Sequence, residues 1–258
     1  KQMAGANGSH AANPEKGRRY EEKDPGQKIA GKSNSPNYIA MKLKITGYLL
    51  CFFFMAIFFA QSQRILTEAK LTYNVIPLPE NGQETLAAAF KNATYTVWLR
   101  GNMARIDFFS QTRQQSVIYN TTTGHATLLR ESGDEKYQWN LDSAQWKVFN
   151  KKWTPTSFRE TGETAMLENY NCTRVIAHYS GGDSASIFYT TQISPLASGY
   201  DPMFEGLRGI PVQYEWVIGG LKMRYRLESV QTGPVGALRF DLPKTGYKII
   251  EAPVERPQ

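Results

Sequence analysis

Alternation of apolar and polar residues is the feature that most constrains the fold of this chain. It is clearest on either side of Gly219-Gly220, where every second residue is apolar. These residues are Val212, Tyr214, Trp216 and Ile218 before the glycine pair, and Leu221, Met223, Tyr225 and Leu227 after it. A period of two is typical of a strand with one buried face, and the glycine pair suits a tight turn. The segment therefore predicts an antiparallel hairpin that is packed on one side and solvated on the other.

The same period recurs from Ile65 onward, with turn residues between the segments. Residues 71–75, 95–99 and 104–108 alternate, and Gly101-Asn102 between the last two suits a two-residue hairpin connection. Further strands are expected at 117–120, 125–130, 156–164, 172–179 and 185–191. The pattern predicts a mainly β, antiparallel fold.

Two helices interrupt the predicted strands. The first covers Glu84 to Lys91, which contains an alanine run. The second covers Asp142 to Trp153, with Asp142 as its N-cap and Trp146 and Phe149 on its apolar face. Ser194 to Gly209 is a long loop containing Pro and Gly, and loops of that length in a compact domain are often functional. We hypothesise that this loop is a lid over the concave face of the sheet.

The front of the chain is predicted to be separate from the domain. Residues 41–62 have a positive start at Lys42 and Lys44, an apolar run, and small residues at Ala60 and Ser62, which together are typical of a signal peptide. The alternative is a membrane anchor, but the run is shorter than the roughly 20 residues that cross a bilayer. Residues 1–40 are polar, predicted to be disordered, and interpreted as lying upstream of the true start. Residues 63–258 then form a single β domain with no stable transmembrane segment after cleavage.

The net charge gives no support to nucleic-acid binding. Of the 30 Lys and Arg, 21 follow residue 62, and of the 23 Asp and Glu, 19 do, so this part carries a formal charge of +2. Basic and aromatic residues interleave in Lys222-Met223-Arg224-Tyr225-Arg226, but strand alternation accounts for that pattern. We expect no nucleic-acid partner.

Catalytic and metal-binding patterns are weak. Cys51 lies inside the apolar run, so Cys172 is the one thiol expected in the domain, and it is interpreted as a buried structural residue. His178 lies six residues along the same predicted strand, about 20 Å away, too far for a thiol–imidazole pair. No clustered Cys or His spacing is typical of a metal site. The sequence predicts a protein without catalytic residues, metal or cofactor.

Several segments resemble a family of exported Gram-negative proteins of unknown function. They are Thr161-Gly162-Glu163-Thr164, Asn169-Tyr170-Asn171-Cys172, Phe188-Tyr189-Thr190-Thr191, Tyr200-Asp201-Pro202 with Phe204 to Tyr214, which resembles a GLPGLI-type segment, and Phe240 to Tyr247. That family is similar to the LolA and LolB lipoprotein carriers. The resemblance implies an incomplete, half-open antiparallel β-barrel with short helices or loops over its open face. It also implies a periplasmic or outer-membrane location in a Gram-negative bacterium. Arg208 stands where the family usually has Pro, and no functional residue of the family carries over.

Two functions fit this interpretation. The first is a non-catalytic periplasmic or envelope protein that binds an acyl chain, lipid or lipoprotein in the half-barrel. The second is a structural or interaction protein whose barrel is filled by its own side chains and whose partner is another envelope protein. Strand parity predicts the residues that line the concave face: Val97, Leu99, Ile106, Phe108, Tyr189, Tyr214, Trp216, Met223, Tyr225 and Leu227. The same parity predicts that Arg100, Arg105, Lys222, Arg224 and Arg226 face away and lie in water.

Overall fold

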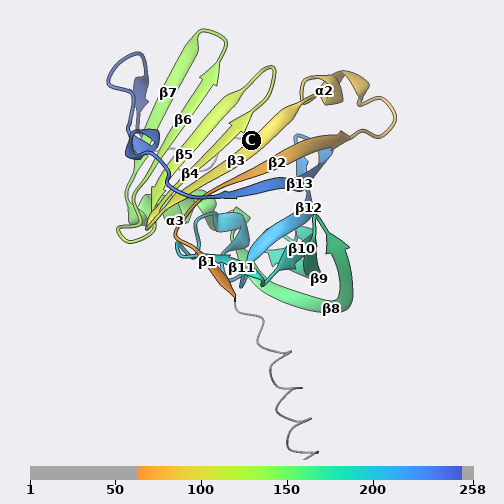
Figure 1. Cartoon of the computed structure of the whole chain (residues 1–258). Helices are drawn as coiled ribbons and strands as arrows, with labels where there is room; N and C mark the ends of the chain where they lie inside the picture. The colour runs from red at the N-terminus through yellow and green to blue at the C-terminus, as the bar shows by residue number, and fades with distance from the viewer. Residues whose placement is uncertain (1–62, 252–258) are drawn as a thin grey trace, which may run out of the picture. The chain divides into compact units, whose positions relative to one another are not determined.

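One large, mostly antiparallel sheet dominates the computed structural model, which describes residues 63–251 (Figure 1). The predicted leader at 1–40, the predicted signal peptide at 41–62 and residues 252–258 lie outside the described residues. The sheet has 12 strands in the order β14-β7-β6-β5-β4-β3-β2-β13-β12-β10-β9-β8. Its first and last strands do not pair, so the sheet is not closed into a barrel, as the family resemblance implied.

Most strands follow the segments predicted from alternation. Their bounds are β2 Glu68–Leu78, β3 Ala93–Arg100, β4 Met103–Phe109, β5 Gln114–Asn120, β6 Ala126–Ser132, β7 Glu135–Leu141, β8 Pro155–Leu167, β9 Tyr170–Tyr179, β10 Ser184–Thr190, β12 Ile210–Ile218, β13 Leu221–Thr232 and β14 Lys248–Ile250. The sequence analysis missed β7 and β14, which form one edge of the sheet through a parallel pair. A separate parallel pair joins β1 (Arg64–Leu66) to β11 (Ile193–Pro195).

Both predicted helices are present. The first, α2 (Glu84–Ala88), is shorter than predicted. The second, α3 (Ser143–Asn150), begins at Asp142, whose carboxylate accepts a hydrogen bond from the backbone N–H of Gln145 while the Gln145 side chain accepts one from the Asp142 N–H. This capping box fixes the start of the helix, which 3₁₀ helix η1 (Lys151–Trp153) then extends. Short 3₁₀ helices also occur at η2 (Pro202–Phe204) and η3 (Ala237–Phe240).

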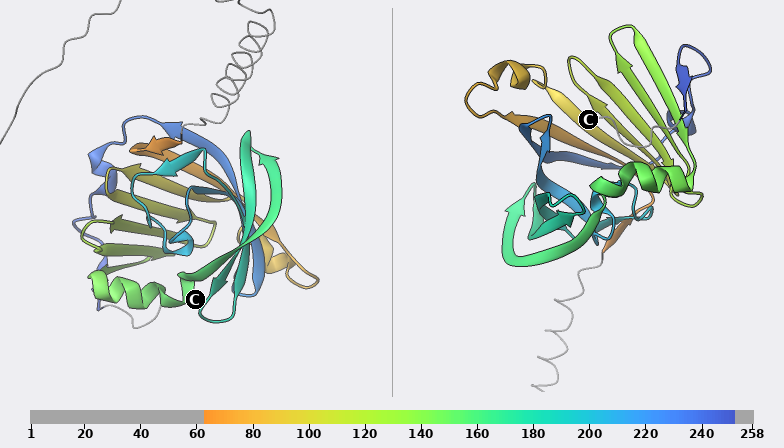
Figure 2. Two further views of the ribbon diagram at one scale, coloured as in Figure 1. Left: turned by 90° about the horizontal axis from the view of Figure 1, so that it is seen from below. Right: turned by 180° about the vertical axis from the view of Figure 1, so that it is seen from behind.

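The sheet is curved, and the side chains on its concave face form the core. Most residues at alternate positions of β2, β3, β12 and β13 are buried, which confirms the predicted alternation. On the concave side lie α3, whose Trp146 and Phe149 are buried, and the segment 196–209 (Figure 2, left). The predicted loop at 194–209 therefore lies over the concave face, although it starts with strand β11 and contains η2.

The convex face is partly covered by residues 233–247, here called the C-terminal strap. The Arg105 guanidinium donates a hydrogen bond to the carbonyl oxygen of Arg239 (2.8 Å), and the Arg239 guanidinium lies 4.3 Å from the Trp98 ring centroid. Farther along, the Tyr247 hydroxyl donates to Glu131. The prediction that Arg105 lies in water is therefore wrong, because the strap covers it and leaves its side chain 18% exposed. The sequence analysis had correctly placed Arg105 on the convex face but had no element to cover it.

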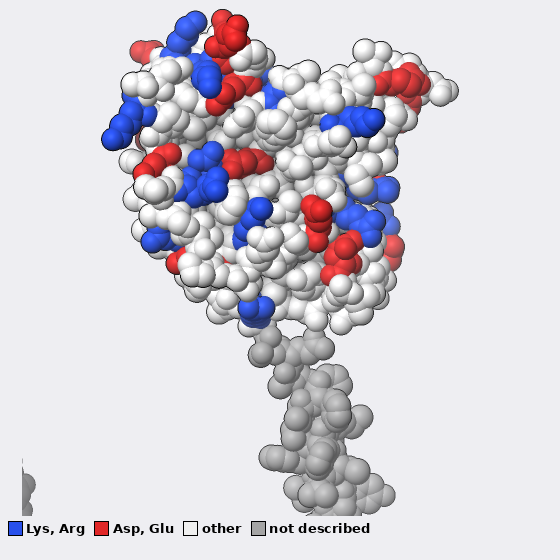
Figure 3. All heavy atoms as spheres, turned by 45° about the horizontal axis from the view of Figure 1, so that its top comes forward, with Lys and Arg blue, Asp and Glu red and all other residues white. Residues whose placement is uncertain are grey.

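Charges of both signs are interspersed on the face shown in Figure 3, which carries no large area of Lys and Arg alone. Neighbouring opposite charges pair in several places on the domain, as Lys136 does with Glu131 at 2.7 Å. Among residues 63–251, no helix has the length and apolar character needed to span a bilayer.

Candidate functional site

Cross-strand rows define the concave face between β2 and β7. The strand registers place four rows of neighbouring side chains on this face, numbered here from the end nearest α3. The first two are apolar apart from one tyrosine: Ala69, Leu99, Ala104, Tyr119, Ala126 and Leu141, then Leu71, Val97, Ile106, Val117, Leu128 and Trp139. The third row is Tyr73, Tyr95, Phe108, Gln115, Arg130 and Tyr137. The fourth row is Val75, Ala93, Ser110, Arg113, Ser132 and Glu135. Polarity thus rises with distance from α3.

One part of this face is filled by the protein itself. We call it the closed half: the concave side of β2, β13 and β12 together with Tyr95 of β3, with segment 196–209 packed against it. The Phe204 ring of this segment packs edge-on against Tyr214 (4.8 Å between centroids), and Tyr214 stacks on Tyr225 (4.6 Å, 3° between planes). The Tyr73 hydroxyl donates a hydrogen bond to the carbonyl oxygen of Pro211 (2.9 Å). These contacts leave the closed half densely packed with aromatic side chains.

Asp201 connects segment 196–209 to the sheet. Its carboxylate accepts hydrogen bonds from the Tyr95 hydroxyl and from the backbone N–H of Met203, the latter at 2.9 Å. The side chain is buried, with 5% of the residue exposed. Nearby, the Tyr179 hydroxyl donates to the carbonyl oxygen of Met203 (3.2 Å). A buried carboxylate needs such donors, so these bonds fix the position of the segment.

The tyrosines of the closed half strongly favour their neutral forms. Burial raises the pKa of Tyr73, Tyr95 and Tyr214 well above the ordinary value, and the negative charge of Asp201 raises each further. Burial likewise raises the pKa of Tyr200, with the neighbouring Tyr73 adding to the shift. These hydroxyls are therefore protonated at neutral pH and do not act as acid–base groups.

Most of the ten predicted cavity residues belong to the packed core. Eight are buried: Val97, Leu99, Ile106, Tyr214, Trp216, Met223, Tyr225 and Leu227. Phe108 and Tyr189 are half-buried. Only these two can meet a ligand without movement of the protein, so a ligand-lining role for the whole set stays a prediction.

The part of the concave face farther from α3 is more exposed. We call it the open half: Phe108, Gln115, Arg130 and Tyr137 of the third row, with Arg113 of the fourth. Each is half-buried, whereas Leu128, two residues before Arg130 in the same strand, is buried. In Figure 2 (right), α3 crosses one end of these strands and their other ends extend past it. Phe90, which follows α2, adds a ring 6.3 Å from that of Phe108.

Arg113 and Arg130 distinguish the open half chemically, and the sequence analysis missed both. Burial lowers the pKa of Arg113, and the positive charge of Arg130 lowers it further. Arg130 shares the parity of Ala126 and Leu128, so correct alternation through β6 would have placed it on the concave face. Arg113 precedes β5 in a connection that the sequence analysis did not assign, and it gave no comparable signal.

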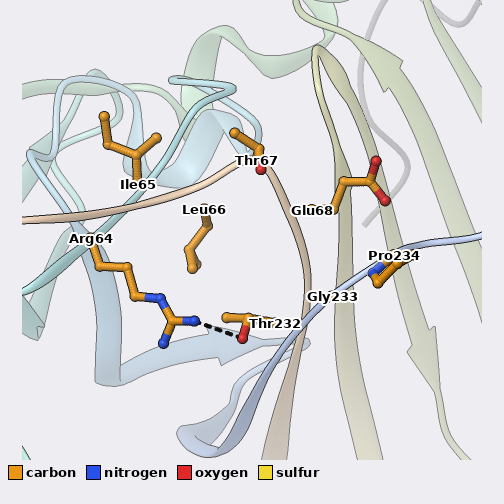
Figure 4. Close-up of a pocket in the computed structure, with 8 residues that line it drawn as sticks. All are labelled: Arg64, Ile65, Leu66, Thr67, Glu68, Thr232, Gly233 and Pro234. Carbon is orange, nitrogen blue, oxygen red and sulfur yellow. Dashed lines mark hydrogen bonds between the residues drawn. The ribbon is translucent and has the colours of Figure 1, made fainter.

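Two hollows lie elsewhere on the domain. One, of about 420 Å³, is formed by Arg64–Glu68 and Thr232–Pro234 where β1 meets the start of the strap (Figure 4). Its polar groups bind one another, since Arg64 donates to the Thr232 hydroxyl (2.9 Å) and Glu68 accepts from the Val235 N–H (2.6 Å). The other, of about 250 Å³, lies between convex-face residues such as Arg174, Phe188 and Glu215. Both hollows are shallow and lie where two elements meet. Neither presents a set of unpaired polar side chains that point toward one ligand.

Cys172 is buried, as predicted, with 2% of the residue exposed. Burial raises the pKa of its thiol to about 11, so the thiol is protonated at neutral pH and a poor nucleophile. In residues 63–251 no cluster of three or more His, Cys, Asp or Glu side chains could hold a metal ion.

Comparisons with known proteins give structural likeness only. No protein-family model matches the sequence, and no curated protein matches it. PNGF-II is similar in structure at 12% identity and a TM-score of 0.42, and the match covers 72% of this chain but 31% of PNGF-II. A chain of the Pseudomonas aeruginosa MucA/MucB complex is similar at 13% identity and a TM-score of 0.35, covering 68% of this chain and 56% of that one. A LolA superfamily protein from Nitrosomonas europaea is similar at 9% identity and a TM-score of 0.33, covering 71% of this chain and 94% of that one. The LolA class, which the sequence resemblance implied, is thus among the similar structures, and at these scores the likeness carries no information on a ligand.

Proposed function

We propose that this chain is an exported, non-catalytic protein that binds an apolar ligand against the open half of its concave face. One observation carries the proposal: along β4–β7, all four residues of the second row are buried, whereas all four residues of the third row are half-buried. The third row keeps aromatic side chains, Phe108 and Tyr137, at positions that are half-buried. Exposed aromatic surface inside a concave sheet is typical of a binding site.

The proposal relocates the predicted site within the same face. The closed half holds Tyr214, Tyr225 and Phe204 in mutual ring contact, so a ligand there would have to displace the protein's own side chains. The open half requires no such displacement. No catalytic step is included, and the raised pKa of the Cys172 thiol supports that choice.

An acyl probe with a neutral head group tests the proposal. A monoacylglycerol carrying an environment-sensitive fluorophore on its chain should bind the purified protein, and Phe108→Ala should weaken binding by about tenfold, the loss expected for one buried aromatic side chain. Phe109→Ala is the matched control, because Phe109 is the next residue of β4, faces the opposite side and is 54% exposed. Equal effects of the two substitutions would contradict the proposed site.

The second candidate is an interaction protein whose barrel is self-filled, and the packing of the closed half favours it. Its partner would be another envelope protein docked on the same open half. Native mass spectrometry of the protein purified from its own compartment separates the two functions. A bound lipid-sized mass that is present on the parent protein and absent from Phe108→Ala supports ligand binding. If the folded protein carries no lipid mass and does not bind the probe, the interaction protein is favoured.

A further inference from the structure

Two arginines come together in the open half from separate elements. Arg130 lies opposite Gln115 in the pairing of β5 with β6, and Arg113 lies two residues before Gln115 on the same face. The hydrogen bond from the Ser110 N–H to the Arg113 carbonyl (2.9 Å) continues the hairpin and holds Arg113 in this register. Diagonal neighbours in such a pair have Cα atoms about 7–8 Å apart, within reach of two long side chains. Both guanidinium groups can therefore converge on one ligand.

The two guanidinium groups have no ion pair or hydrogen bond with any other residue between 63 and 251. Arginines of the convex face differ in this respect: Arg105 pairs with Asp107, Arg174 with Glu163, Arg224 with Glu215 and Arg226 with Glu168. The one carboxylate of the fourth row, Glu135, instead accepts from the Tyr137 hydroxyl and lies 4.0 Å from Lys248. Two like charges thus lie side by side on a partly buried surface, and no carboxylate within residues 63–251 pairs with either, which is unfavourable unless an anion binds there.

We propose that Arg113 and Arg130 bind the head group of a lipid that ends in a phosphate monoester, with its acyl chain lying along Phe108 and Phe90. This inference rests on the proposed function and specifies its ligand. Charge complementarity supports it, since a phosphate monoester carries close to two negative charges at neutral pH, matching the two guanidinium groups.

Phosphate fits this pair better than a carboxylate does. A carboxylate has two oxygens and is satisfied by a single bidentate arginine, whereas a phosphate presents three oxygens in different directions and can take donors from two arginines. The apolar chain also has a defined path. Phe108 lies two strands from Arg130 in the same row, about 10 Å away at the usual strand spacing, and Phe90 continues the aromatic surface beyond it.

The test uses one fluorescent acyl chain on three head groups: a phosphate monoester (lysophosphatidic acid), an uncharged glycerol ester (monoacylglycerol) and a free carboxylate (the fatty acid). The probes are kept below their micelle concentrations. The protein should bind the phosphate probe at least about tenfold more tightly than either other probe, the effect of a charge-assisted hydrogen bond. Arg113→Gln and Arg130→Gln should each remove about tenfold of that affinity and should weaken monoacylglycerol binding far less. Added salt should weaken phosphate-probe binding selectively.

Arg159→Gln is the matched control, because Arg159 is an exposed arginine of β8, at the other edge of the sheet. Arg130→Lys keeps the charge but loses the planar donor pair, so it should bind with intermediate affinity. Equal affinity for the phosphate and glycerol probes would overturn the arginine assignment while leaving the proposed apolar site standing. Equal affinity for the carboxylate and phosphate probes would overturn the choice of phosphate. Failure of all three probes to bind folded protein would overturn the proposed function itself.

Discussion

The two halves of the concave face are both built from alternating strands, but a chain segment covers one half and leaves most of the other uncovered. In the closed half, segment 196–209 returns over the sheet and brings Phe204 and Asp201 against the tyrosines of β2, β3 and β12. In the open half, α3 covers only one end of the strands, and Trp146 reaches Tyr119 of the first row at 5.3 Å between ring centroids. Polar side chains then take the positions that no chain segment covers.

One sheet can therefore combine a part that stabilises the fold with a part that is suited to recognition. Two aromatic hydroxyls of the closed half donate to fixed acceptors, Tyr73 to the Pro211 carbonyl and Tyr95 to the Asp201 carboxylate, so their polarity is satisfied within the protein. The charges of Arg113 and Arg130 in the open half face an environment without a carboxylate partner among residues 63–251. The first arrangement stabilises the fold, and the second is suited to an external anion.

Alkaline pH should give the largest effect, because it should lower the unfolding free energy through the buried tyrosines of the closed half. Tyr73, Tyr95, Tyr200 and Tyr214 have pKa values raised by burial, so the folded state holds their protons more tightly than the unfolded state does. Their contribution to stability is complete below the unfolded pKa of about 10 and is lost as pH rises above it, by up to about 1.4 kcal/mol per pH unit for each tyrosine. Urea unfolding between pH 8 and pH 11.5 measures this slope.

Tyrosine replacements show which half of the concave face causes this dependence of the unfolding free energy on pH. Tyr214→Phe should make it shallower by removing one buried hydroxyl. Tyr137→Phe should change it less, because in the open half it is mainly the hydrogen bond to Glu135 that raises the pKa of Tyr137. An unfolding free energy that stays flat above pH 10 would contradict the closed packing.

Truncation of one aromatic residue in each half gives the next largest effect. Tyr214→Ala should lower the unfolding free energy by about 3–5 kcal/mol, as for other large residues removed from a core. Phe108→Ala should cost about 1 kcal/mol, because its ring is half-buried and the gap remains open to solvent. Chemical denaturation of the two variants and the parent protein makes the comparison, and equal losses would mean that the two halves are packed alike.

The sequence predicted the strands better than the segments that pack over them. Alternation placed β2, β3, β4, β12 and β13 correctly, and Asp142 correctly marked the start of α3, because these signals are local. Nothing local indicated that the C-terminal strap would cover Arg105, or that residues 248–250 would pair with β7. Such contacts join segments over a hundred residues apart, and they form through docking rather than through a periodic pattern.

The candidate site was predicted only in part for the same reason. Parity identified the concave face, but exposure along that face depends on what packs over it. Tyr214 and Phe108 look equivalent in the sequence, yet Phe204 covers Tyr214, while Phe108 remains half-buried beside Phe90. Arg130 shares the parity of Ala126 and Leu128, but the sequence analysis did not extend the assignment of faces to residues 125–130.

Asp201→Asn should have a smaller effect than Tyr214→Ala, and it tests what holds segment 196–209 on the closed half. Asn keeps an oxygen for the Met203 N–H but lacks the charge that strengthens the bond from Tyr95, so the unfolding free energy should fall by about 1–3 kcal/mol. Amide hydrogen exchange should rise within residues 196–209 and stay unchanged in β4–β7. Glu205→Gln, which changes an exposed carboxylate of the same segment, is the control and should leave exchange unchanged.

The neutral acyl probe should bind Asp201→Asn as it binds the parent protein, because Tyr73, Tyr214 and Tyr225 still fill the closed half when the segment loosens. Additional probe binding that depends on Tyr225 would instead identify segment 196–209 as a lid over a second ligand site, and the two halves would then differ in gating rather than in kind.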